Sequence, residues 1–470
     1  MRDPGAARGP TRAGQSGAQS APVRRRSVLV PLSRSRREAI RTNLWTVPSF
    51  MVVLIVGLFA ITYSVDQRAA AGAIALFAWL SFGSPDVARE ILIAIASSVI
   101  TVAGVVFSIT ILVLQLASQQ FGPRMLRNFI RDTGTQVSLG AFVATFVYSV
   151  LTLEVVSDPP ELFVPHLSTS VAVALVLIDL GVLIYFINHV AFSIQLTSVV
   201  SGIAADFRTT LAQMQANEWQ LPQTGAHQDA FDALHETARS GEAIAAQSSG
   251  FLQAVGYERL LAIASESNAV IQLLHRPGHF VVAGQPLARV VPPAAVGPVS
   301  RALVRAHIVG PNRTLTQDPA FAIDQLVEVA LRALSPAVND TFTGLNCIDW
   351  LGDCLCHAYA QRLPSGIYCD ALGNIRVIEP VITYEGLLKR ATDKIRQAGR
   401  GMPAILIRQL ENLQKLMTLV TTPAQRETLL HHARLVLETG DESVREEADR
   451  RDIHAAFDTL LVVSNEIWEG

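Results

Sequence analysis

The sequence predicts a membrane α-helical bundle of four transmembrane helices, followed by a cytoplasmic α+β domain that contains a small barrel-sandwich-like β module. Three observations predict this fold class. Half of the 470 residues are hydrophobic and only 17% are charged. The long uninterrupted apolar runs lie almost entirely before residue 200. After residue 245, short apolar runs alternate with turn residues instead. A chain of this length exceeds one small core, so several structural units are expected.

The first unit, residues 1–33, is rich in Gly, Ala, Ser, Pro and Arg and has no hydrophobic period. Such a composition cannot bury enough apolar surface to fold, so we expect a disordered, Arg-rich N-terminus. No signal peptide is expected, because the first apolar run begins only near Trp45 and no small-residue cleavage site accompanies it.

Residues 34–195 are expected to form the transmembrane domain, since a bilayer core takes about 20 apolar residues in a helix. The predicted spans are 47–65, 91–114, 137–156 and 167–187. Trp45 and Tyr63 bracket the first span, as is typical of aromatic rings at membrane interfaces. Segment 69–82 is apolar but only about 14 residues long, which favours an interfacial or re-entrant segment. Whether it enters the membrane, as a fifth span, stays open.

Arginine placement predicts the orientation. Arginines 24–26, 34, 36, 37 and 41 precede the first span, and arginines 124, 127 and 131 fill the loop after the second. The loop before the second span carries only Arg68 and Arg89, and the loop between the last two spans has no Lys or Arg. The positive-inside rule therefore predicts a multi-pass protein of the cell (inner) membrane with both termini in the cytoplasm.

The loop after the second span has a further property. Gly122-Pro123 should end the preceding helix, and Arg124, Arg127 and Arg131 would then share one face of a short helix. Such a helix can lie on the inner leaflet with its arginines against anionic lipid headgroups. A solvated loop helix without lipid contact is the alternative.

Small and hydroxyl-bearing side chains recur at helical spacing in two spans. The second span carries Ser97, Thr101 and Ser108 on one face, and the third carries Thr145 and Ser149. These stripes permit close helix packing, or they line a path for ions or small solutes, and the sequence favours packing.

Asp179 lies midway along the fourth span, where an ionised carboxylate costs about 2.5–3.5 kcal/mol on insertion scales. No Lys or Arg lies in any predicted span, so its expected partner is a hydroxyl, Thr145 or Ser149. An intramembrane acid is a candidate functional group, and a neutral tie between helices is the alternative.

The remaining chain divides into a helical linker (196–245), a small β-rich module (246–310) and a helical region (311–470). The run RPGHFVVAGQPLARV resembles the hairpins of barrel-sandwich modules related to lipoyl and biotinyl domains. Those carriers need a lysine at the hairpin tip, and no lysine precedes Lys389, so a swinging-arm carrier is excluded. Asp318 before Pro319, and later Asp340, are expected to cap helices.

The second half contains Cys347, Cys354, Cys356 and Cys369, with His357 on the same predicted helix as the first three. Paired zinc motifs such as C-x2-C are absent, so reduced, buried thiols without metal or another cofactor are expected. No phosphate loop, nucleophile elbow, H-E-x-x-H or dinucleotide motif occurs, so the sequence favours a protein that is not an enzyme. A net charge of −2 gives no basic field for nucleic acid.

Several runs together resemble a known family. These are TVAGVVFSITILVLQLASQQFGPRMLRNFIRD, FVPHLS, IYFINHVAFSIQ, QDPAFAIDQLVEVALRALSPAVND and CIDWLG. They are similar to bacterial predicted membrane proteins catalogued as domain of unknown function 2254, over about residues 37–461. Thr341 stands where the family motif Asn-Asp-Pro has its proline. The resemblance implies a membrane protein and supplies no activity or site residue.

The sequence thus indicates an inner-membrane protein of undefined activity, in contact with the lipid bilayer. A channel or transporter with a cytoplasmic regulatory domain is the leading hypothesis. A membrane-anchored sensing or interaction module is the alternative, and a membrane-bound enzyme is a third. A homo-oligomer stays open.

Overall fold

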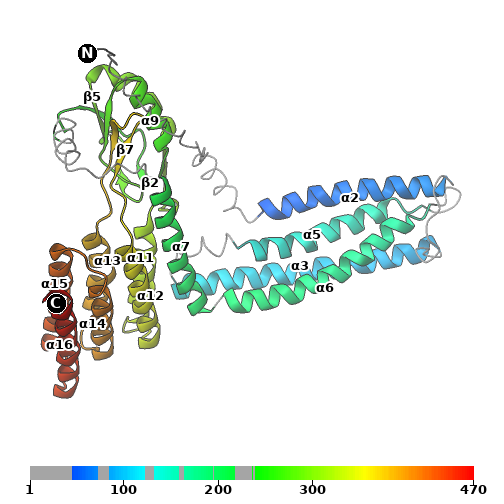
Figure 1. Ribbon diagram of the computed structural model, residues 1–470. Coiled ribbons are helices and arrows are strands. Elements are labelled where there is room, and N and C mark those ends of the chain that lie inside the picture. Colours follow the sequence, from blue (N-terminus) through cyan, green and yellow to red (C-terminus); the bar gives the residue numbers. More distant parts are fainter. Residues whose placement is uncertain are drawn as a thin grey trace, which may run out of the picture.

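A computed structural model describes residues 45–71, 84–121, 132–157, 163–193, 195–217 and 239–469, together with residue 236. At residues 118, 120, 121, 216, 217 and 469 it describes the backbone alone. Predictions for residues 1–33, for most of segment 69–82 and for Arg124, Arg127 and Arg131 fall outside the described residues. The structure has two parts, a membrane bundle and a C-terminal region (Figure 1). The end of the bundle nearer the C-terminal region is called proximal here, and the other end distal.

The membrane bundle has four helices that are long and apolar enough to cross a bilayer, as predicted. They are α2 (Thr46–Ala70), α3 (Pro85–Phe121), α5 (Thr133–Glu154) and α6 (His166–Ser193). Helix α5 contacts the other three, and 56% of its most apolar stretch is buried, against 17–22% for its neighbours. The outer faces of α2 and α6 expose large apolar side chains such as Val53, Leu177 and Ile184, which suits contact with lipid tails.

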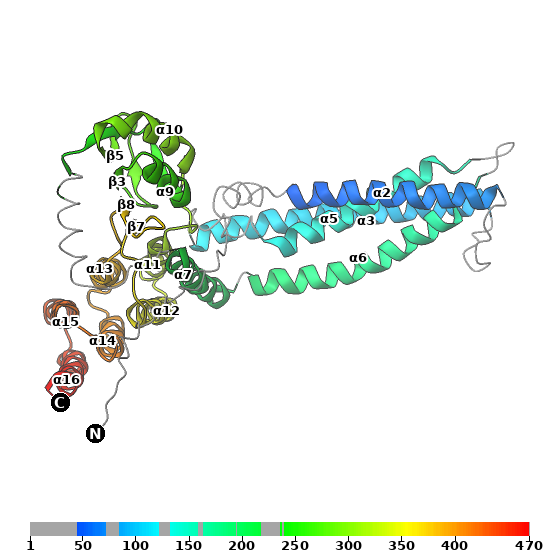
Figure 2. The same ribbon diagram turned by 45° about the horizontal axis from the view of Figure 1, so that its top comes forward.

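Helix α3 is 37 residues long and extends past both ends of the predicted span 91–114. Its proximal end leaves the bundle and reaches the C-terminal region (Figure 2). There Ala117 is buried in one hydrophobic core with Val200 and Ile203 of α7 (Leu196–Asn217). The bundle and the C-terminal region therefore share a core.

The C-terminal region continues with a β module of two sheets. One sheet has the strand order β1-β5-β3-β8-β7 and the other β4-β2-β6. The strands are β1 (Glu242–Ala245), β2 (Gly250–Val255), β3 (Val270–Leu273), β4 (Phe280–Val281), β5 (Pro286–Val291), β6 (His307–Gly310), β7 (Ile367–Cys369) and β8 (Ile375–Ile378). Helices α9 (Tyr257–Glu266) and α10 (Val296–Ala306) contribute Leu260, Ala264, Val299 and Leu303 to the core of the module.

The mixed helical and sheet region is present as predicted, but its barrel-sandwich detail is not confirmed. Across the described strands neither sheet closes into a barrel. Strand β8 joins the sheet by parallel pairing with β3, with Ile271 opposite Val377, and β7 pairs antiparallel with β8. Strands β1, β7 and β8 lie outside the range 246–310, so the module takes in chain from both sides of it.

Six helices complete the chain, and Figure 2 shows several of them nearly end-on. They are α11 (Pro319–Ala333), α12 (Thr341–Ala360), α13 (Tyr384–Ala398), α14 (Pro403–Met417), α15 (Pro423–Ser443) and α16 (Glu447–Glu469). Asp340 caps α12 as predicted, accepting a hydrogen bond from the Thr343 amide at 3.0 Å. Asp318 precedes α11 but forms no capping bond. Its carboxylate bonds to Arg313 instead, because two charged donors of Arg313 lie within reach.

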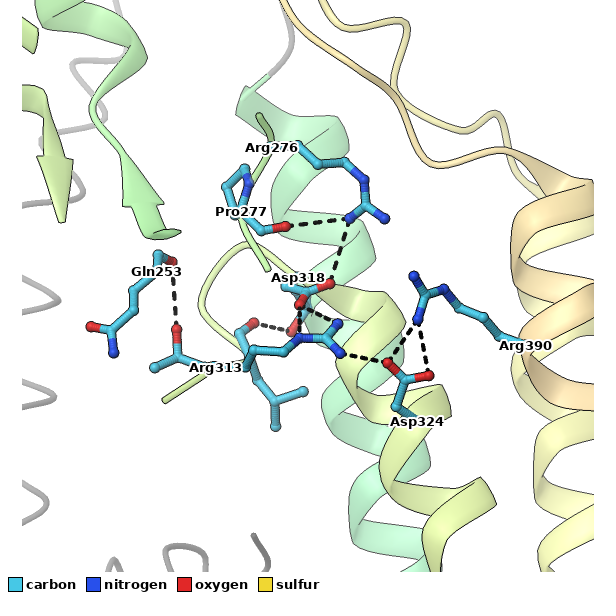
Figure 3. A network of polar contacts seen from close by, with 10 residues as sticks. Gln253, Arg276, Pro277, Arg313, Asp318, Asp324 and Arg390 are labelled. Atoms are coloured by element: carbon cyan, nitrogen blue, oxygen red, sulfur yellow. Dashed lines mark hydrogen bonds and ion pairs between the residues drawn. The ribbon is translucent and has the colours of Figure 1, made fainter. Parts of the chain in front are cut away.

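The start of α11 joins the β module to the helical region (Figure 3). Gln317 accepts a hydrogen bond from the Val255 amide at 2.8 Å and donates one to the Val255 carbonyl at 3.1 Å, as a neighbouring strand would. Asp318 is fully buried and accepts from Nε and Nη2 of Arg313 at 2.9 and 2.6 Å. Arg276, in the loop between β3 and β4, lies 3.7 Å from the other oxygen of Asp318.

Candidate intramembrane polar site

Asp179 lies on α6 and is 5% exposed, inside the membrane bundle. The side chain of Thr145 on α5 lies beside its carboxyl group, while Oδ2 has no hydrogen-bond partner among the residues that the structure describes. The structure therefore brings together Asp179 and one of the two hydroxyls proposed from the sequence. An unpartnered carboxyl oxygen in an apolar bundle is costly, so it calls for an explanation.

Thr145 belongs to a buried hydroxyl face of α5 that also contains Ser149 and Thr152. Ser149 donates to the Thr145 carbonyl at 2.9 Å and Thr152 to the Tyr148 carbonyl at 2.8 Å. These three residues lie at spacings of four and three, so they fall on one side of the helix. Together with Asp179 they are called the α5–α6 seam below.

At the distal end of the bundle lies a second buried carboxylate, which no sequence pattern singles out. Asp66 of α2 is 3% exposed and accepts hydrogen bonds from the amides of Leu167 and Ser168 at 2.8 and 2.9 Å and from the Ser168 hydroxyl at 2.7 Å. Asp66 thus caps the first turn of α6 from another helix. The predicted first span ended at Val65 and left this residue in a loop.

Tyr148 connects Asp66 and Ser168 to the hydroxyl face of α5. Its side chain is fully buried, and its hydroxyl lies 2.8 Å from the Thr62 hydroxyl of α2. The same hydroxyl also lies near the side chains of Ser168 and Thr152. The distal half of the bundle therefore contains several buried polar side chains from α2, α5 and α6.

The proximal end carries a different pair. Asp132 caps α5 through the Thr135 amide at 2.9 Å, and its Oδ2 lies 2.8 Å from Nε2 of His189 on α6. The His189 ring stacks on Tyr185, with ring centroids 5.3 Å apart. This pair ties the proximal ends of α5 and α6 together.

Between this pair and Asp179 the buried side chains are of both kinds, with Gln136 and Ser138 of α5 among the polar ones. Phe142 of α5 and Phe186 of α6 are each 1% exposed and belong to the hydrophobic core of the bundle. Ser138 is buried there as well, but it donates to the Gly134 carbonyl of its own helix at 2.9 Å. Buried polar side chains therefore occur on both sides of Asp179 along the bundle.

The stripe predicted on the second span lies elsewhere. Ser97, Thr101 and Ser108 are exposed on the outer surface of α3, and each donates to a carbonyl of its own helix. The structure does not bring them to Asp179, so only the α5 hydroxyls belong to the seam.

The cysteines of the helical region are free thiols. Cys347 and Cys354 are buried in the large core, and burial raises the pKa of Cys347 to about 12 and that of Cys354 well above its ordinary value. Over the described parts of the chain, no group of three or more His, Cys, Asp or Glu side chains is placed to hold a metal ion.

A family of predicted membrane proteins of unknown function, DUF2254, matches residues 41–415, which is most of the chain. The chain belongs to this family. It is similar to uncharacterized proteins of Mycobacterium bovis and Mycobacterium tuberculosis strain H37Rv, each 31% identical over 441 residues, covering 90% of this chain and 82% of the relative. No solved structure matches the chain. The DUF2254 protein is thus a membrane protein, in contact with lipid, whose relatives carry no assigned activity.

Proposed function

We propose that this DUF2254 protein is an inner-membrane transport protein that moves a small cation through the α5–α6 seam under the control of a cytoplasmic C-terminal region. The observation that carries the proposal is Asp179, an acid buried at the centre of the bundle with one carboxyl oxygen unpartnered. Ionisable groups inside a membrane are expensive to bury and mark substrate or ion pathways.

A helix bundle that serves only as an anchor has no need of such a group. Apolar side chains alone would satisfy the bilayer, whereas an ionised Asp179 costs about 2.5–3.5 kcal/mol on insertion scales. The seam also places Thr145, Ser149 and Thr152 on the buried face of the central helix. The carboxylate would supply the charge that attracts a cation, and the hydroxyls would supply oxygens along its route.

The arginine distribution supports a cytoplasmic C-terminal region, and the shared core supports control of the bundle by that region. The arginines around the first two spans favour a cytoplasmic C-terminal region. That region holds the proximal end of α3 in its own core, and α11 packs against both α3 and α7. Because packed cores resist continuous deformation, a rearrangement of the C-terminal region would move the proximal end of α3 and so change the packing of the bundle.

The test is flux through liposomes that contain the purified full-length chain, with Asp179→Asn as the perturbation. Asn keeps the size and the hydrogen-bonding capacity of Asp but cannot ionise. We expect cation flux above that of empty liposomes, lost in Asp179→Asn and retained in Ser97→Ala, which changes an exposed hydroxyl of α3. An absence of flux under every gradient would reject transport and favour a membrane-anchored sensing or interaction module.

A further inference from the structure

We propose that the C-terminal region binds an oxyanion, the phosphate or carboxylate group of a small molecule, between the side chains of Arg276 and Arg390. Arg276 lies in the loop between β3 and β4, and Arg390 lies on α13. The two arginines therefore come from the two units that meet at the start of α11. The proposal does not depend on transport, because it concerns another part of the chain and is tested by binding.

The two guanidinium groups approach the same space from opposite sides. Figure 3 shows them pointing toward one another beside the carboxylates of Asp318 and Asp324. Burial lowers the pKa of Arg276 against the opposing effect of Asp318. The like charges of Arg390 and Arg313 lower it further. Two cations that face each other repel, and an anion between them would turn this repulsion into attraction.

Both side chains keep unused hydrogen-bond donors. Arg390 donates to Asp324 through Nη1 alone, at 3.1 and 2.9 Å. Arg276 donates through Nη1 to the Pro277 carbonyl at 3.3 Å, and the same atom lies 3.7 Å from Asp318. Within the described residues, Nε and Nη2 of both arginines form no hydrogen bond. These two nitrogen atoms share one edge of the planar guanidinium, which is suited to bidentate binding of a carboxylate or phosphate.

The two carboxylates of this network do not neutralise its three guanidinium groups. Arg313 is bonded to both Asp318 and Asp324, so these carboxylates already share one positive charge. Arg276 adds a second charge beside Asp318, and Arg390 adds a third beside Asp324. Three positive charges thus meet two negative ones, and one positive charge is left over.

A third carboxylate, that of Glu379, does not remove this excess at the arginine pair. The hydroxyls of Tyr257 and Tyr368 donate to Glu379 at 2.7 and 2.8 Å. Its charge also affects the pKa of Arg276 less than either neighbouring arginine does.

His279, in the same loop as Arg276, responds to the local field. Burial and then positive neighbours lower its pKa to about 4, and these neighbours are Arg276, His275, Arg390 and Arg313. The charges that act most strongly on this imidazole are thus all positive. A positive field together with free guanidinium edges favours an anionic ligand.

The position of the site connects it to the rest of the chain. Arg276 lines a small cavity together with Gln317, Glu379 and Met214 of α7. Helix α11, which begins beside the site, packs against α3 and α7. An anion that bridges Arg276 and Arg390 would hold the β module against the helical region. It would therefore favour one arrangement of the helices that contact the bundle.

The test is isothermal titration calorimetry of the purified full-length chain in detergent. The probes are inorganic phosphate and citrate, each compared with sodium chloride at equal ionic strength, because salt screens non-specific attraction. We expect saturable binding of at least one probe, and which of them binds identifies the group. Arg390→Gln should weaken it at least tenfold, since one of the two guanidinium groups is lost while Arg313 still holds Asp324.

Arg408→Gln is the matched control. Arg408 is 34% exposed, against 39% for Arg390, and it also pairs with carboxylates, those of Asp349 and Glu411. It lies on α14 and takes no part in the network, so its loss should leave the binding of the probe unchanged. Arg390→Lys keeps the charge but not the bidentate edge, and it should bind with intermediate affinity. Circular dichroism verifies that each variant is folded, and Arg390→Lys replaces Arg390→Gln if the latter unfolds.

Hydrogen exchange locates the bound anion. Saturating probe should slow the exchange of amides in residues 275–279 and in α13 of the parent, and should have no such effect in Arg390→Gln. The proposal is overturned if neither probe binds the parent more than chloride does, if Arg390→Gln binds as tightly as the parent, or if protection appears only elsewhere. None of these results bears on cation flux, so the site and the transport function can fail separately.

Discussion

Replacing Gly278 with Ala is expected to disrupt the contact between the β module and the helical region. Gly278 has a φ of +95°, and a Cβ atom there would lie 2.1 Å from Oδ2 of Asp318. That distance is impossible, so Asp318 would have to move. Asp318 is fully buried and bonded to Arg313 by two hydrogen bonds of 2.9 and 2.6 Å, so it cannot move without losing them.

The magnitude follows from two contributions. A left-handed backbone costs a non-glycine residue about 1–2 kcal/mol. Removing one partner of a buried ion pair costs about 3–5 kcal/mol, so Gly278→Ala should lose roughly 4–7 kcal/mol in total. Gly284, in the loop after β4, provides the control: its φ is +82° and its Cβ would meet nothing within 4 Å. Gly284→Ala should therefore lose only the backbone contribution of about 1–2 kcal/mol.

The assay is thermal unfolding of the full chain in detergent, followed by near-ultraviolet circular dichroism. At about 2–4 °C per kcal/mol, Gly278→Ala should unfold at least about 6 °C below Gly284→Ala. Asp318→Ala removes the obstructing carboxylate, so adding Gly278→Ala to it should cost only the backbone contribution. Equal unfolding temperatures for the two glycine variants would show that the contact with Asp318 contributes nothing to stability.

The remaining predictions concern topology, domain structure, thiols and pH. Reporter fusions after residues 120 and 200 should report the cytoplasm, and those after residues 85 and 160 the outer side; an outer signal at 200 would overturn the orientation. A fragment starting at residue 196 should be soluble and unfold cooperatively, and aggregation even in detergent would contradict that. Cys347 and Cys354 should resist maleimide at pH 8 until the chain is denatured, because burial raises their pKa values; rapid labelling of the native chain would refute their burial. Burial raises the pKa of Asp370, but hydrogen bonds from Arg376 and Asn374 outweigh it and lower this pKa to about 2. The Asp370 carboxylate should therefore stabilise the β7–β8 hairpin fully above pH about 4 and lose this effect as the pH falls to about 2. The protection of the hairpin amides against hydrogen exchange, relative to unstructured amides at the same pH, should show this loss in the parent. In Asp370→Asn this protection should not change with pH.

Local sequence patterns predicted the elements whose formation depends on local chemistry. The four spans follow from apolar runs long enough for a bilayer. The β strands from β2 to β6 lie within the predicted β-rich range 246–310, and α11 begins at Pro319, directly after the Asp318 expected to precede a helix. These elements are bounded by turn residues and have one buried face, so their pattern is visible in a single segment.

Contacts between distant segments were beyond such patterns. Strand β8 pairs with β3, although it lies about a hundred residues later in the chain. The two strands meet only in the folded chain, so no local sequence signal specifies their pairing. Asp66 caps a helix that begins 100 residues later, so the sequence alone gave no reason to select it. Thr145 could be proposed as a partner of Asp179 because both lie near the middle of apolar spans, where few other polar groups are available.

The length of α3 has a mechanical consequence. A continuous helix of 37 residues is a rod of about 55 Å, anchored at one end in the bundle and at the other in the core of the C-terminal region. If such a rod tilts by about 10° around its distal end, its proximal end moves sideways by about 10 Å. Helices tilt to match their apolar length to the thickness of the surrounding bilayer. A thinner or thicker membrane would therefore act on the C-terminal region through α3 as a lever, and lipid composition becomes a physical input to a part of the protein outside the four membrane-crossing helices.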